Sequence, residues 1–193
     1  AAVAVVGGSD VTLGGGGFVV MGGVAGSNVA IDNNEIMARN NGSAATLFLN
    51  NDGGDVNLAM EGTARCRVLE ITGADLAEKF PVSAAVEPGM VVMIDAQNSG
   101  KLCPAQGEYN PRVAGVVSGA NGLPAGTILG HLPGSEQSPP IALSGRVWTL
   151  CDANETAIEI GDSLTTAERA GHAMKASDRE RAGGTMIGKA MTA

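Results

Sequence analysis

The sequence predicts an all-β protein, made of a repetitive short-strand stalk followed by a small β-barrel-like or sandwich domain. Repetition at a fixed period is typical of architectures in which no single unit can bury its own apolar face. Glycine accounts for 29 of the 193 residues and aromatic residues for only 3%, and such a composition suits many turns and disfavours helices. Three apolar pairs recur with an 18-residue step, namely Val11/Leu13, Val29/Ile31 and Leu47/Leu49.

Residues 1–62 are expected to form the stalk. In each predicted strand, residues i and i+2 are mostly apolar, which is the period of a strand with one buried face. The stretches between strands are rich in Asn, Asp and Gly, which tolerate a positive φ and therefore predict tight turns. The predicted strands are Val11–Leu13, Phe18–Met21, Val29–Ile31, Ile36–Ala38, Leu47–Leu49 and Val56–Leu58.

Strands this short make few ladder hydrogen bonds, so a lone sheet of them would be marginally stable. Three chains wound about a common axis solve this problem, because the apolar face of each chain then meets the other two. We therefore predict an intertwined homotrimer, with a single-chain solenoid as the alternative. If Val29 and Ile31 face the axis, Ile31→Asp should abolish assembly, whereas Asp32→Ala should be mild if that side chain is only solvated.

Residues 63–80 are expected to join the stalk to the second domain. Arg65 and Arg67 alternate with apolar residues as in a strand, and they are interpreted as a solvated or inter-subunit salt-bridge face. The stretch 73–79 could hold a short helix, closed by Pro81.

Residues 81–193 are predicted to form a compact β domain. Short strands at even spacing, separated by Gly- and Pro-containing turns, are typical of small barrels and sandwiches. The predicted strands are Met90–Ala96, Lys101–Pro104, Val113–Ser118, Thr127–Leu129, Ile141–Leu150, Ser163–Thr166, His172–Ala176 and Thr185–Met191.

Charge and composition exclude several function classes. The net charge is −8, without a run of Lys or Arg, so nucleic-acid binding is not expected. No apolar run approaches the roughly 20 residues of a membrane-spanning helix. Cys66, Cys103 and Cys151 form no CxxC or CxxH pair, which disfavours a zinc site and favours buried free thiols.

A serine hydrolase triad is the first catalytic arrangement to weigh. It could recruit Ser144 or Ser163, with Asp162 and His172. No GxSxG motif is present, and His131 is the only other histidine. A histidine that packs locally at a strand entry is therefore the favoured interpretation.

Two further motifs are better explained as turns. The oxygen-rich stretch 50–55 could hold Ca²⁺, but it lacks the spacing of known calcium loops. Gly14–Gly17 is not followed by the Lys-Ser/Thr of a phosphate loop. We therefore predict no catalytic, cofactor or metal site, and no enzyme activity.

An ordered series of short motifs covers residues 86–190. The motifs begin at Pro88 (PGMVV), Arg112 (RVAGVVSG), Ala142 (ALSGRV), Gly161 (GDSLTT), Gly171 (GHAMKA) and Ile187 (IGKA). This series resembles a β-rich domain at the C-terminal end of phage tail-fibre and spike proteins and of related bacterial surface proteins, and Ile31–Gly42 similarly looks like a stalk repeat of such fibres. Some relatives belong to a self-cleaving family that helps phage appendages to trimerise.

The repeat and the resemblance together predict a structural protein, a trimeric fibre or spike segment of a phage tail or phage-like particle. It would be extracellular or part of a virion. It would bind copies of itself, and a cell-surface receptor or glycan through loops such as Gln97–Gly100, Gln106–Asn110 or Leu132–Pro140. The alternatives are an extracellular filament that polymerises by strand exchange and a self-cleaving hydrolase, for which no motif places a nucleophile.

Overall fold

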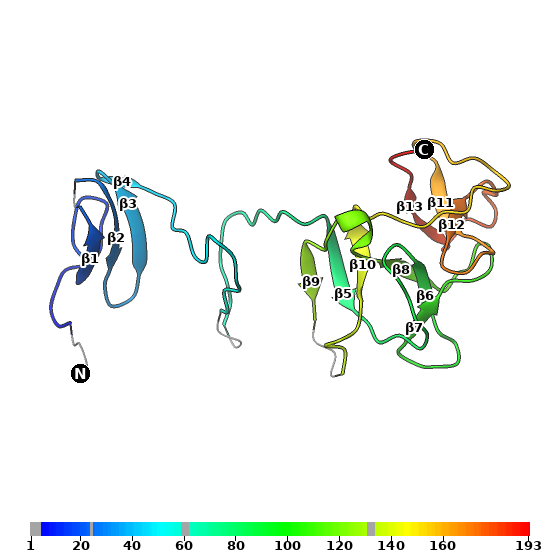
Figure 1. Ribbon diagram of the computed structural model, residues 1–193, viewed down its shortest axis with the longest axis horizontal. Helices are drawn as coiled ribbons and strands as arrows, with labels where there is room; N and C mark the ends of the chain where they lie inside the picture. The colour runs from blue at the N-terminus through cyan, green and yellow to red at the C-terminus, as the bar shows by residue number, and fades with distance from the viewer. Residues whose placement is uncertain (1–4, 24, 59–61, 131–133) are drawn as a thin grey trace. The chain divides into compact units, whose positions relative to one another are not determined.

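The computed structural model describes residues 5–23, 25–58, 62–130 and 134–193 (Figure 1). Contacts divide the chain into two compact units, Ala1–Cys66 and Arg67–Ala193. The all-β prediction is confirmed, because the described residues form thirteen strands and one short 3-10 helix, η1 (Ala120–Gly122).

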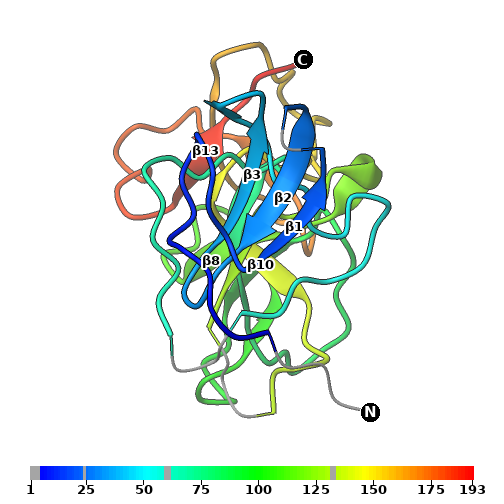
Figure 2. The same cartoon turned by 90° about the vertical axis from the view of Figure 1, so that its left-hand side faces the viewer.

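The first unit holds an antiparallel sheet with the strand order β1-β2-β3-β4, and Figure 2 shows β1, β2 and β3 side by side. Three of its strands overlap stretches that the sequence predicts as strands: β1 is shifted by one residue toward the C-terminus, while β2 and β3 each extend two residues beyond the prediction at one end. The strands are β1 (Val19–Gly22), β2 (Ser27–Ile31), β3 (Ile36–Asn40) and β4 (Ser43–Ala44).

One face of this first sheet is covered by the chain segment that precedes it. Ala30 of β2 is fully buried, and a Cβ built on Gly17 would lie 3.4 Å from both the Ala30 Cβ and a methyl group of Val11. Arg39 of β3 is also buried, and it donates to backbone carbonyls of this preceding segment. The buried residues of β2 are therefore Asn28 and Ala30, whereas the larger pair Val29 and Ile31 was expected to form the buried face.

The 18-residue repeat does not continue as strands. The predicted strands Leu47–Leu49 and Val56–Leu58 are outside every strand of the described chain, and Val11–Leu13 contributes only the single bridge between Thr12 and Gly15. A strand needs a neighbour to pair its backbone groups. The stretch after β4 has no such neighbour within the described part of its own chain.

The second unit holds two sheets. The larger has the order β7-β6-β8-β10-β5-β9 and the smaller β12-β11-β13. The pairing is antiparallel except between β5 and β9, which run parallel. The strands are β5 (Asp75–Lys79), β6 (Val91–Ile94), β7 (Leu102–Pro104), β8 (Val113–Val117), β9 (Thr127–Leu129), β10 (Pro140–Gly145), β11 (Ser163–Thr166), β12 (Ala173–Lys175) and β13 (Met186–Lys189).

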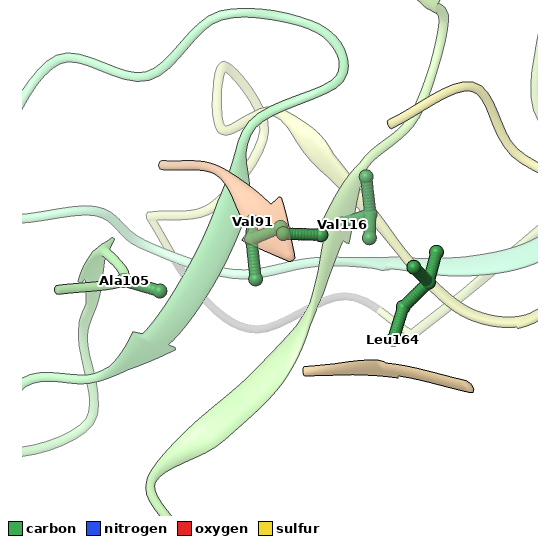
Figure 3. Close-up of a cluster of buried hydrophobic side chains, with 5 residues drawn as sticks. Val91, Ala105, Val116 and Leu164 are labelled. Carbon is green, nitrogen blue, oxygen red and sulfur yellow. The ribbon is translucent and has the colours of Figure 1, made fainter. Parts of the chain in front are cut away.

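The two sheets of the second unit pack through a shared apolar cluster. Val91 and Val116 come from the larger sheet, Leu164 and Ala173 from the smaller, and Ala105 follows β7 (Figure 3). Neither sheet closes into a barrel. Of the two predicted architectures for this region, the structure therefore does not show the barrel-like one.

A second cluster lies on the opposite side of β6 and β8. It contains Val92, Leu102, Val117 and Ile141, with the partly buried Phe80 packed against it. Because alternate residues of β6 enter different clusters, this strand is buried on both faces, which explains its unbroken apolar sequence.

The helix expected at 73–79 is wrong, because Asp75–Lys79 forms β5. This strand belongs to the larger sheet, although it falls in the stretch expected as a junction. Gly73 and Gly126 permit the parallel pairing with β9, since a Cβ on Gly73 would lie 2.2 Å from the Gly126 Cα. Tertiary pairing thus overrides the helix-favouring Ala, Leu, Glu and Lys of the segment.

Candidate functional site

His172 and Asp162, two of the residues weighed for a catalytic triad, make separate local contacts. The Nδ1 atom of His172 lies 2.8 Å from the carbonyl oxygen of Ala170. The carboxylate of Asp162 pairs with the Lys175 ammonium at 2.8 Å and accepts a hydrogen bond from the backbone N–H of Glu159. His131 lies outside the described residues. The contacts of the described chain therefore do not join the candidates into a nucleophile–base pair.

The electrostatics of the Asp162–Lys175 pair fit a structural role. The hydrogen bond from Lys175, followed by that from the Glu159 N–H, lowers the pKa of Asp162. The same hydrogen bond raises the pKa of Lys175. A general acid or base works best with a pKa near the operating pH, and both shifts move these groups away from neutrality.

The two motifs weighed as a calcium loop and a phosphate loop are turns. Asn50, at φ 50°, donates through its side-chain amide to the Asp55 carbonyl at 2.6 Å. The carbonyl oxygens of Gly15 and Gly16 accept hydrogen bonds from Arg39, whereas a phosphate loop directs N–H groups at its ligand. No group of three or more His, Cys, Asp or Glu side chains in the described parts of the chain is arranged to hold a metal ion.

The three cysteines are free thiols, but the expectation that they are buried is wrong for two of them. Cys66 and Cys151 are exposed, and Cys103 is half-buried. Cys103 belongs to β7, an edge strand of the larger sheet, which accounts for its partial exposure.

A cavity with a volume of about 430 Å³ lies in the second unit. Its lining includes Glu108 and Tyr109, which belong to the loop Gln106–Asn110, one of the loops expected to bind a receptor or glycan. Both basic groups of the lining are already engaged. Lys175 pairs with Asp162, while Arg181 pairs with Glu108 at 3.4 Å and stacks on the Tyr109 ring at 4.4 Å.

Exposed large apolar side chains are concentrated in the stretch between β4 and β5, part of which belongs to each unit. The described residues of this stretch, 45–58 and 62–74, contain no helix or strand. Phe48 is 69% exposed, and Val68 and Leu69 are 74% and 73% exposed. The other large apolar side chains of this stretch, also exposed, are Leu47, Leu49, Val56, Leu58 and Ile71.

The sequence indicated part of this stretch and missed the rest. Leu47, Leu49, Val56 and Leu58 were expected to be apolar positions of stalk strands. For the exposed pair Val68 and Leu69, the sequence predicted only a strand-like alternation of charged and apolar residues. Exposed apolar patches mark interaction surfaces in native proteins, so the part of this stretch that the structure describes within the first unit, residues 45–58, is the candidate functional site.

The described residues include no helix that is long and apolar enough to cross a membrane. Comparison of the chain with protein-family models, with curated proteins and with solved structures finds no match.

Proposed function

We propose that this chain is a structural protein, a segment of a homotrimeric fibre or spike that belongs to a phage tail or phage-like particle. The observation that supports this proposal is the exposure of the large apolar side chains at 45–58. The resemblance of the ordered short motifs to those of phage fibre and spike domains supports the choice of particle.

The exposed stretch favours association because water contacts its apolar side chains in the isolated chain. Fully burying a Leu or Phe side chain stabilises by about 1.5–3 kcal/mol. Covering the large apolar side chains of residues 45–58 would therefore contribute on the order of 5–10 kcal/mol per chain, allowing for the fraction already buried. These side chains are Leu47, Phe48, Leu49, Val56 and Leu58. This is comparable to the roughly 4–15 kcal/mol that association costs in lost freedom of motion.

A closed trimer and an open filament use this driving force differently. Closed rotational symmetry ends at a fixed number of subunits, whereas a head-to-tail contact that does not close continues as a filament. Negative-stain electron microscopy separates the two, because a closed trimer gives discrete rods and a filament gives an axial repeat of subunits.

A matched pair of charge substitutions tests the proposal. Leu58→Glu and Asn57→Glu add the same charge to neighbouring exposed residues, but only the first removes an apolar side chain. We expect wild type and Asn57→Glu to be trimeric by light scattering at micromolar concentration, and Leu58→Glu to dissociate. A monomeric wild type would overturn the proposal, as would a Leu58→Glu variant as stably trimeric as wild type.

A further inference from the structure

The first sheet has one apolar face that no described residue of its own unit covers. The register places Val19 and Ile36 on either side of Ile31, and Met21 and Ala38 on either side of Val29. Because directly opposed residues of antiparallel strands project to the same side, all six side chains share one face. We refer to Val19, Met21, Val29, Ile31, Ile36 and Ala38 as the open face.

Exposure distinguishes the open face from the opposite one. Met21 and Ile36, on the outer strands, are each 56% exposed, and the four remaining residues of the open face are half-buried by their neighbours. On the opposite face Asn28, Ala30 and Arg39 are buried. The sheet is therefore covered on one side only, although its uncovered side carries the larger apolar residues.

The open face contains no ionisable side chain. The chain as a whole carries a net charge of −8, so most contacts between two copies would bring like charges together. A neutral apolar face is one at which two or three copies can meet without that repulsion. A positively charged partner, which the net negative charge of the chain would attract, would find no acidic side chain to bind on this face.

The open face is smaller than a stable interface, so further surface of each copy must contribute. Five residues at about 3.3 Å each, across three strands about 4.8 Å apart, give an area of roughly 200 Å². A stable interface covers about 800 Å² on each partner, so this face alone is too small. A copy of the same chain can also cover the exposed apolar side chains at 45–58, which follow the sheet directly in sequence.

We propose that the open face is an interface between copies of this chain, with the face of each copy directed at the faces of the others around their common axis. This inference rests on the proposed self-assembly and identifies where in the first unit that assembly occurs. An interface between copies at the open face would explain why the sheet is covered on one side only within its own unit.

Two neighbouring residues of β1 provide the test. Met21 belongs to the open face, whereas Val20, 37% exposed, projects to the other side of the sheet. We expect Met21→Glu to convert the assembly to monomers at micromolar concentration, and Val20→Glu to retain the wild-type mass in light scattering. Circular dichroism of each variant, compared with wild type, shows whether the fold persists.

Cross-linking tests the same contact without adding charge. In a Cys66→Ser/Cys151→Ser background, Met21→Cys should give a covalent dimer on mild oxidation with copper–phenanthroline, and Val20→Cys should not. A full-mass Met21→Glu assembly, or equal cross-linking of both variants, overturns this inference while the proposed self-assembly stands. A wild-type chain that is monomeric overturns the proposed function itself.

Discussion

The Nε atom of Arg39 donates a hydrogen bond to the Oδ1 atom of Asn28 at 2.8 Å, which links β3 to β2. The same guanidinium donates through Nη1 to the carbonyl oxygens of Thr12 and Gly15 at 2.6 and 2.7 Å. Only 2% of Arg39 is exposed. The Arg39 side chain therefore connects the N-terminal segment to both β2 and β3 by hydrogen bonds.

Replacing Arg39 should loosen the N-terminal segment. Arg39→Met removes the hydrogen bonds that the guanidinium makes to Asn28 and to the carbonyls of the N-terminal segment, at a cost of about 2–4 kcal/mol. Arg39→Lys should rescue little, because an ammonium lacks the planar fork of donors. Hydrogen exchange of residues 11–17 measures the effect, with the exposed Arg65→Met as control. Wild-type protection in Arg39→Met would contradict this role.

Asp32 is a capping residue and not a merely solvated one. Its Oδ1 accepts hydrogen bonds from the backbone N–H groups of Asn34 and Glu35, at 3.0 and 2.9 Å, and its Oδ2 accepts from the N–H of Val11 at 2.9 Å. The expectation that Asp32→Ala is mild is therefore wrong in its premise. The same bonds, that of Asn34 first, lower the pKa of Asp32.

The lowered pKa of Asp32 predicts acid sensitivity of the first unit. Because the folded pKa lies below the unfolded value of about 4, the stabilisation is present above that pH and is lost as the pH falls through the folded pKa. Asp32→Asn should weaken this pH dependence between about pH 2 and pH 5. Thermal melting across that range is the measurement, and identical slopes for wild type and variant would contradict the assignment.

Gly115 of β8 is fixed by close packing against β10. A Cβ at this position would lie 2.5 Å from the Ala142 carbonyl oxygen and 2.9 Å from a methyl carbon of Ile141. Gly115→Ala should therefore destabilise the second unit by about 1–3 kcal/mol. Gly188→Ala in β13 is the control, because no atom lies within 4 Å of its built Cβ. Urea unfolding, followed by Trp148 fluorescence, measures the stability of both variants. Equal losses of stability would contradict the close packing at Gly115.

Ile31→Asp tests the open face through pH. In an assembly around an axis, the variant brings one carboxylate from every copy together, and both burial and like charge disfavour ionisation. We expect dissociation at pH 7 and reassembly on acidification, as the carboxylates become protonated. Sizing at several pH values provides the readout, and Val20→Asp is the control on the opposite face. A pH-independent mass would refute the arrangement.

The sequence predicted the strands whose signal is local. Val91–Ile94 follows the turn at Pro88–Gly89, and Ser163–Thr166 follows Gly161. In both cases a turn residue precedes a run of residues that favour strands. β5 was missed because its residues favour a helix in isolation, and its strand state depends on two partners distant in sequence.

The open face of the first sheet was predictable only in part. The apolar pattern of Val29 and Ile31 indicated a face that needs covering. It could not show that Asn28 and Ala30 lie beneath the chain's own N-terminal segment, because that contact depends on a buried Arg39. Arginine is usually exposed, so neither composition nor periodicity places it in a buried network.

The mass of the full chain in solution is the most direct test of the central claim of self-assembly. Multi-angle light scattering over a range of micromolar concentrations should give three times the 19.3 kDa of one chain, because burial of the exposed apolar side chains drives association. A monodisperse species with the mass of one chain over that range would contradict the claim.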